Sequence, residues 1–143
     1  MSVLTAGSTY DELSRFKDAE YNIVVHEECG NNIVKWLKQE YGMPYLIPSE
    51  GAPIGFYALG SFINEISVLL STNPEPGLQK IKKAKEKFYL HLSRVNSLTG
   101  LPRGTSFAVN AEPSIAYALT KWLYEYLGMC PVSVKVPCSK QIN

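Results

Sequence analysis

The fold is decided by the segment NIVVHEECGNN at residues 22–32. Its first half, NIVVH, is a β-branched run bounded by polar residues, which predicts a short buried strand. Its second half ends in GNN, where we expect a helix to begin, and apolar residues follow at helical spacing as far as Tyr41. A buried strand that leads into an amphipathic helix is the opening of a βαβ unit, so this segment predicts an α/β fold.

The rest of the chain continues the same alternation. Strands that alternate with helices of these lengths imply parallel sheets with right-handed crossovers. We therefore predict an α/β, Rossmann-like fold of three αβα layers with short parallel sheets, in which a long helix joins two βαβ units. Outside residues 22–41, the predicted elements are a short helix ending near 17, a strand at 44–48, a helix at 53–70, a long helix at 78–98, a strand at 105–109, a helix at 112–127 and a strand at 132–136.

Composition excludes several classes of protein. The chain has 143 residues, 45% of them hydrophobic, and a net charge of +1, so it can bury a core but has no electrostatic reason to bind nucleic acid or an anionic membrane. Its three cysteines form no CxxC pair, which argues against a disulfide framework or a zinc ribbon. The N-terminus lacks the pattern of a signal peptide, and the longest nearly uncharged stretch, residues 51–64, is too short to span a bilayer. We expect a soluble, cytoplasmic protein.

The most chemically reactive stretch is His26-Glu27-Glu28-Cys29, between the first strand and its helix. Open α/β sheets bind ligands at the carboxyl ends of their strands, and histidine, carboxylate and thiolate can all ligate a metal. Four adjacent residues cannot converge on one ion, so a metal site that uses His26 and Cys29 needs further ligands from elsewhere. The alternatives are a loop that lines a substrate or an interface, and a plain solvated loop.

Two predicted helix starts can either hold an anion or be capped. Gly30 and Asn31 can present backbone N–H groups to an anion, although asparagine is also an ordinary capping residue. Glu112 follows a predicted strand, where it can line a ligand site or complement the dipole of the next helix. No GxGxxG or GxxxxGK[ST] motif supports nucleotide binding. A basic run is either a patch for polyanions or a solvated helix surface, and comprises Lys80, Lys82, Lys83, Lys85 and Lys87.

Several motifs, taken in order, resemble the nitrogenase component 1 family. In that family a strand of the type LNLVL leads to a helix ending in E-x-Y/F-G-I/M-P, and here AEYNIVV at 19–25 precedes EYGMP at 40–44. Pro53-Ile54-Gly55 is similar to the family's P-I/M-G before a helix. GTSFAVNAEP at 104–113 resembles its G-K-R strand and G-D-P turn, and LYEYLGMCPV at 123–132 resembles L-x-E-L-G-x-x-P-V with one extra residue. The resemblance covers about residues 4–137.

The resemblance implies an oxidoreductase subunit about three times longer, with three Rossmann-like domains. On that pattern, residues 1–73 are the second half of a middle domain, residues 74–101 a connecting long helix, and residues 102–143 the start of a following domain. Such a subunit pairs with a paralogous component 1 subunit, accepts electrons from an ATP-dependent iron–sulfur reductase, and reduces a substrate at a metallocluster or tetrapyrrole site. The loops 26–31, 48–55 and 110–114 are then expected to face an interdomain cleft.

From these loops we predict candidate site residues but no catalytic residue. The candidate cofactor-binding residues are Glu27, Gly30, Asn31, Pro53, Gly55 and Glu112, and the candidate metal ligands are His26 and Cys29. The motifs also depart from the family: the domain that supplies cysteine ligands to an iron–sulfur cluster has no counterpart, and Glu27 stands where the cofactor-binding nitrogenase subunit has a cysteine ligand.

These departures limit what the isolated chain can do. We expect no cofactor and no activity in the isolated segment, and an exposed apolar surface that makes it a homo-oligomer. An iron–sulfur or related metallocluster is implied only for a full-length subunit. Two rival hypotheses stay open: a non-catalytic binding or assembly module with the same fold, and a generic Rossmann-like transferase lobe.

Overall fold

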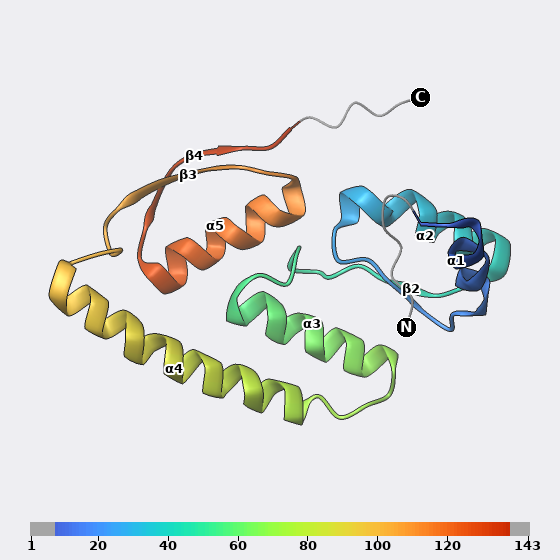
Figure 1. The fold of residues 1–143 in the computed structure, drawn as a ribbon, viewed down its shortest axis with the longest axis horizontal. Coiled ribbons are helices and arrows are strands. Elements are labelled where there is room, and N and C mark those ends of the chain that lie inside the picture. Colours follow the sequence, from blue (N-terminus) through green and yellow to red (C-terminus); the bar gives the residue numbers. More distant parts are fainter. Residues whose placement is uncertain (1–7, 138–143) are drawn as a thin grey trace.

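The structure, a computed structural model, describes residues 8–137 apart from the side chains of residues 12, 13, 16 and 17. These residues form two parallel two-stranded sheets on opposite sides of the molecule, with helices between them (Figure 1). The elements in chain order are α1 (Tyr10–Ser14), the 3-10 turn η1 (Arg15–Asp18), β1 (Asn22–Ile23), α2 (Glu27–Tyr41), β2 (Tyr45–Leu46), α3 (Gly55–Leu69), α4 (Glu75–Thr99), β3 (Ser106–Asn110), α5 (Pro113–Leu127) and β4 (Cys130–Lys135). The predicted α/β class, with two βαβ units and a long helix between them, is confirmed.

The first βαβ unit consists of β1, α2 and β2, drawn in blue to cyan in Figure 1. Its two strands pair in parallel, with Asn22 opposite Tyr45. A backbone hydrogen bond from the N–H of Val24 to the carbonyl of Leu46, 2.9 Å long, extends the pairing by one residue. Val24, Val34, Leu37 and Met43 are buried, which places a small core inside the unit.

Two helix starts differ from the sequence prediction. We expected α2 to begin at the GNN segment, but it begins at Glu27, directly after His26, whose backbone is extended and serves as the N-cap. Acidic residues in the first turn, Glu27 and Glu28, complement the helix dipole and favour this earlier start. We expected α4 to begin at residue 78, but it begins at Glu75, because proline at position 76 is compatible with a first helical turn.

The second βαβ unit consists of β3, α5 and β4. Its strands pair in parallel from Ser106 opposite Cys130 to Asn110 opposite Lys135, with one register shift after Phe107. Helix α5 covers one face of this sheet (Figure 1). Among the described residues neither strand has a second neighbour, so the free edge of β4 stays open.

An aromatic cluster joins α3, α4 and α5. The ring of Phe56 on α3 lies 5.4 Å from Phe88 on α4 and 5.5 Å from Tyr126 on α5, both at steep interplanar angles. Phe88 also lies 6.2 Å from Trp122. Edge-to-face pairs of this kind contribute roughly 0.5–1.5 kcal/mol each beyond the burial of their area. The cluster therefore holds the long helix against the second unit.

The core is thin for a chain of this size. Helix α4 has 25 residues and none of them is buried, and no large side chain is fully buried among the described residues. The buried apolar side chains are mostly small, and include Ala52, Ala58 and Ala118 where α3, the 48–55 loop and α5 meet, and Ala116 on the side of α5 that faces β4. Within residues 8–137, no helix is long and apolar enough to cross a membrane.

Gly55 is held between two constraints at the start of α3. Its φ of +82° lies in the left-handed region that L side chains rarely adopt. A Cβ at this position would also lie 2.4 Å from Cδ1 of Trp122 on α5, far inside van der Waals contact. The motif Pro53-Ile54-Gly55 thus fixes how closely α3 approaches α5.

We predict that Gly55→Ala destabilises the chain by about 2–4 kcal/mol, the sum of backbone strain and overpacking against Trp122. Urea unfolding followed by circular dichroism measures this difference. The matched control is Gly60→Ala in the same helix, where the added Cβ meets nothing closer than Leu78 at 4.0 Å, so the free energy of unfolding should stay equal or rise by up to about 1 kcal/mol. Equal effects of the two substitutions would show that Gly55 is not a packing constraint.

Candidate functional site

Three loops that follow the carboxyl ends of β1, β2 and β3 converge on one residue, Ser114, at the start of α5. The segment 26–31 reaches it through Glu28, and the segment 48–55 reaches it through Ala52. We expected segments 26–31, 48–55 and 110–114 to face an interdomain cleft, and the structure joins one residue of each through hydrogen bonds at Ser114. This convergence is the geometric centre of the candidate site.

The carboxylate of Glu28 caps α5 from another helix. The backbone N–H of Ser114 donates to Oε1 of Glu28 at 2.6 Å, and the hydroxyl of Ser114 donates to Oε2 at 2.7 Å. An anion at this position satisfies an N–H group that has no partner within the helix and complements the positive end of the helix dipole. The two residues are 86 positions apart, so this contact also ties the two βαβ units together.

The electrostatics of Glu28 follow from the same contacts. Partial burial on its own raises the pKa of the carboxyl group, but the hydrogen bonds from Ser114 and from its own backbone, with the nearby His26, outweigh it and lower the pKa below its ordinary 4.5. Glu28 is therefore ionised at neutral pH. In this state it offers both oxygens to Ser114.

The segment 48–55 approaches the same helix start through its backbone. The N–H of Ala52 donates to the carbonyl of Ser114 at 3.1 Å. The neighbouring Gly51 has a φ of +72°, and a Cβ there would lie 2.6 Å from that same carbonyl oxygen. Only glycine permits both the backbone angle and this close approach.

A second contact between the 48–55 loop and α5 lies further along the helix. The ammonium group of Lys121 forms an ion pair with Glu50 at 3.0 Å and lies 4.0 Å from the centre of the Tyr57 ring. Its hydrogen bond to Glu50 raises the pKa of Lys121 above 10.5. The 48–55 loop is thus held to α5 at two points, Ser114 and Lys121.

The predicted residues of segment 26–31 lie at or in the first turns of α2 and do not converge on one point. Glu27 is exposed and accepts a 3.3 Å hydrogen bond from Asn31, whereas Cys29 is a free, exposed thiol. Gly30 packs against the first unit, since a Cβ there would lie 2.7 Å from a methyl group of Val24. The expectation that Asn31 caps the start of α2 was wrong, because the helix begins four residues before it.

The other predicted residues have separate roles in packing. Pro53 lies just ahead of the α3 start, outside the helix in which we expected it, and Gly55 lies under Trp122. Glu112 occupies the N-cap position of α5, but its side chain makes no capping hydrogen bond. The carboxylate that bonds to the first turn of α5 is that of Glu28, which reaches Ser114 directly.

The candidate metal ligands do not complete a metal site. Among residues 8–137, no group of three His, Cys, Asp or Glu side chains is close enough to hold an ion. Nδ1 of His26 is buried and has no hydrogen-bond partner, so this nitrogen is one atom that could ligate a metal. The free thiols of Cys29 and Cys130 lie on different units. An iron–sulfur cluster ordinarily requires four thiolate ligands, so this part of the chain does not fit one.

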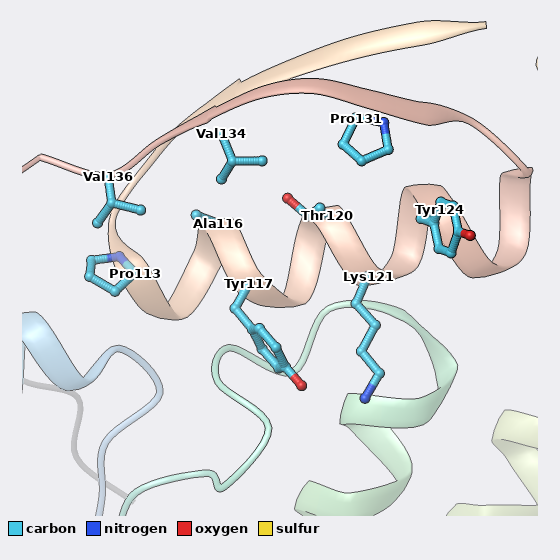
Figure 2. A pocket seen from close by; sticks show the side chains of 9 residues that line it. All are labelled: Pro113, Ala116, Tyr117, Thr120, Lys121, Tyr124, Pro131, Val134 and Val136. Atoms are coloured by element: carbon cyan, nitrogen blue, oxygen red, sulfur yellow. The ribbon is translucent and has the colours of Figure 1, made fainter. Parts of the chain in front are cut away.

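A separate apolar groove runs along the outer side of α5 beneath β4. It encloses about 480 Å³. Figure 2 shows Val134 and Pro131 pointing from β4 toward the helix, and Ala116 and Thr120 pointing back toward the strand. The hydroxyl of Thr120 is buried without a hydrogen-bond partner. Lys121 and Tyr117 also line the groove, but their side chains point away from the strand (Figure 2).

Sequence reasoning missed the pair Glu28 and Ser114 and the pair Glu50 and Lys121. Each of these residues has an ordinary local explanation, as an acid in a first helical turn or as a polar residue on a helix surface. Their partners are 86 and 71 positions away, so no local pattern joins them. Only a signal that pairs distant positions, such as covariation, can find contacts of this kind.

Comparison with known proteins places these features in a family context. A family model described as nitrogenase component 1 type oxidoreductase matches residues 1–141. One subunit of the light-independent protochlorophyllide reductase of Rhodopseudomonas palustris strain HaA2 is 32% identical over 77 residues, which is 54% of this chain and 14% of the relative. The corresponding subunit of Prochlorococcus marinus strain MIT 9301 is 34% identical over 101 residues, or 68% of this chain and 18% of the relative. The chain thus spans less than a fifth of the length of these relatives.

We predict that Glu28→Gln lowers the free energy of unfolding by about 1 kcal/mol at pH 7, because a neutral amide is a weaker cap for Ser114. The folded-state pKa of Glu28 is lowered, so its contribution is present above the unfolded pKa of 4.5 and is lost as the pH falls through the folded value. The native chain should therefore lose more stability than Glu28→Gln between pH 6 and pH 3. Urea unfolding at a series of pH values measures both differences.

The control is Glu27→Gln, since Glu27 is exposed and bonds only Asn31 within its own helix. It should change the free energy of unfolding by less than about 0.5 kcal/mol. Parallel pH profiles for the native chain and Glu28→Gln would contradict the assigned cap.

Proposed function

The chain belongs to the nitrogenase component 1 type oxidoreductase family, and we propose that it forms the interdomain part of a subunit that reduces a substrate with externally supplied electrons. The observation that carries this proposal is the convergence of three strand-end loops at Ser114. Open α/β sheets bind ligands beyond the carboxyl ends of their strands. The segments 26–31, 48–55 and 110–114 all lie at such ends.

The relatives named above suggest the class of reaction. Their names describe a reductase that acts on protochlorophyllide independently of light. We propose a reduction of the same general kind, in which an ATP-dependent iron–sulfur reductase supplies the electrons and a paralogous component 1 subunit completes the site. The residues of this segment contribute position and electrostatics rather than redox chemistry.

The proposed division of roles follows from what each group can do. The candidate metal ligands His26 and Cys29 lie beside the junction, but a cluster needs its other ligands from outside residues 8–137. We therefore assign Glu27, His26 and Cys29 to the lining of the cleft and derive no redox step through them. Glu28 and Gly51 set the distance between the two units, and that distance sets the width of the cleft.

The alternative is a binding or assembly module that uses the same fold without redox activity. The absence of a three-ligand cluster among residues 8–137 favours it. The two proposals differ in whether a cluster and electron transfer accompany the segment, because a binding module needs neither.

The test is a chimera in which this chain replaces the matched segment in the protochlorophyllide reductase subunit of one of these relatives. The chimera is purified without oxygen together with its partner subunit, and iron, acid-labile sulfide and ATP-dependent reduction are measured. We expect stoichiometric cluster and at least about a tenth of the native rate. Glu28→Gln in the chimera should lower the rate by roughly threefold to tenfold, because a misplaced cleft costs positioning.

Glu40→Gln, exposed near the far end of α2, is the control for loss of a carboxylate on the same helix. A folded chimera that assembles with its partner but holds no cluster and no activity would refute the oxidoreductase proposal and leave the binding module. A chimera with full activity in which Glu28→Gln has no effect would retain the reaction but refute the role of the junction.

A further inference from the structure

We propose that Glu65 on α3 is a positioning residue that holds the 48–55 loop in one conformation before any ligand binds. The loop connects β2 to the start of α3 and bonds to the first turn of α5 on the way (Figure 1). The contacts that carry this inference all lie inside the chain, between segments that pack on each other. The order of the loop is a property of this chain, whereas its use in a substrate cleft rests on the proposed function.

The carboxylate of Glu65 accepts hydrogen bonds from the loop and from its own helix. The hydroxyl of Ser49 donates to Oε1, and the N–H of Ser49 donates to Oε2 at 3.3 Å. The hydroxyl of Ser61, one helical turn earlier on α3, donates to the same Oε1 at 3.1 Å. Hydrogen bonds to a carboxylate are roughly twice as strong as those between neutral groups. Ser61 therefore orients the carboxylate on α3, and the carboxylate fixes the loop at Ser49.

The backbone of the loop is itself restricted. The N–H of Gly51 donates to the carbonyl of Pro48 at 3.3 Å, and the N–H of Ile54 donates to the carbonyl of Ala52 at 2.6 Å. Proline fixes φ at positions 48 and 53. Pro48 is buried, and Ala52 is only 1% exposed. A segment with these restraints has few alternative conformations, so an anchor at its start defines the path of the whole loop.

The loop is anchored to two helices that also pack on each other. Glu65 attaches Ser49 to α3. Glu50, the next residue, is attached to α5 through its ion pair with Lys121 at 3.0 Å. Loops that open and close have few buried contacts and few protected backbone hydrogen bonds, whereas this loop has both. It is therefore a preformed wall rather than a lid, and a preformed wall loses less conformational entropy when a ligand binds.

Amide hydrogen exchange of the whole 143-residue chain, followed by NMR, separates this role from general stabilisation, because exchange reports the opening of each segment by itself. Glu65→Gln keeps the size of the side chain and removes its charge. The amides of Gly51 and Ala52 should exchange at least about fivefold faster in this variant, because the charge-assisted bonds to Ser49 are weakened. Amides of β3 and β4 should change by less than about twofold, because the effect is local.

Ser49→Ala is a second variant that leaves the carboxylate in place, and Ser49 is exposed, so the chain stays folded. It should accelerate exchange of the same two amides by about twofold to threefold, because one donor is lost. Combined with Glu65→Gln it should add little, since both substitutions remove the same contact. The matched control is Glu86→Gln, an exposed carboxylate on α4, which should leave the loop unchanged. Equal loop exchange in the native chain and in Glu65→Gln would overturn the proposal, as would a uniform acceleration along the chain.

Glu65→Gln in the chimera described above tests the role in the cleft. A loop that must be ordered during binding weakens the binding of substrate without altering the chemical step, so KM should rise about threefold to tenfold while kcat changes by less than about twofold. Faster loop exchange with an unchanged KM would overturn the positioning role. A chimera that is inactive with the native segment would refute the proposed function alone, and the exchange rates would still decide whether Glu65 orders the loop.

Discussion

The start of helix α5 is the point on which the arrangement of the two βαβ units depends. A helix N-terminus needs acceptors for its free N–H groups, and here the acceptor comes from Glu28 on the other unit. The carbonyl of Ser114 in turn receives the N–H of Ala52, so one residue is bonded to both segments that lead out of the first sheet. If the cap came instead from Glu112, two residues before Ser114 in the chain, the two units would lack this connection. The cap of one helix therefore also fixes the position of the two units relative to each other.

The sequence was sufficient to predict the elements but not their contacts. The β-branched run before His26 and the apolar spacing of α3 and α5 identify strands and helices through local periodicity. The same signals misplaced the start of α2, because Gly30 resembles a breaker. In fact Gly30 lies inside the helix to make room for Val24 of the first strand. The bond between Glu28 and Ser114 could not be predicted, since neither residue carries a local signal for a partner 86 positions away.

Glycine residues and charged side chains hold the junction in different ways. Gly51 and Gly55 fix the distance of closest approach, because any side chain there would collide with Ser114 or Trp122. Glu28 and Glu50 supply the attraction, through Ser114 and Lys121. Steric limits are rigid, whereas exposed ion pairs contribute little energy and respond to pH and salt. The two glycines therefore set how closely the segments can approach, and the two carboxylates supply the attractive contacts between them.

The rigid contacts at Gly51 and Gly55 matter if the segment borders a substrate cleft. A cleft that positions a substrate needs a fixed width, and only features that resist deformation can provide it. Helix α4 has no buried residue and packs along α3, with the aromatic cluster of Phe56, Phe88 and Trp122 adding a contact to α5. The cluster lies on the side of α5 away from the β4 groove, so α5 is anchored by aromatic side chains on one side and by the β3–β4 sheet on the other. With both sides of α5 held, its start keeps a fixed position between the two units, where Glu28 and Ala52 bond to Ser114.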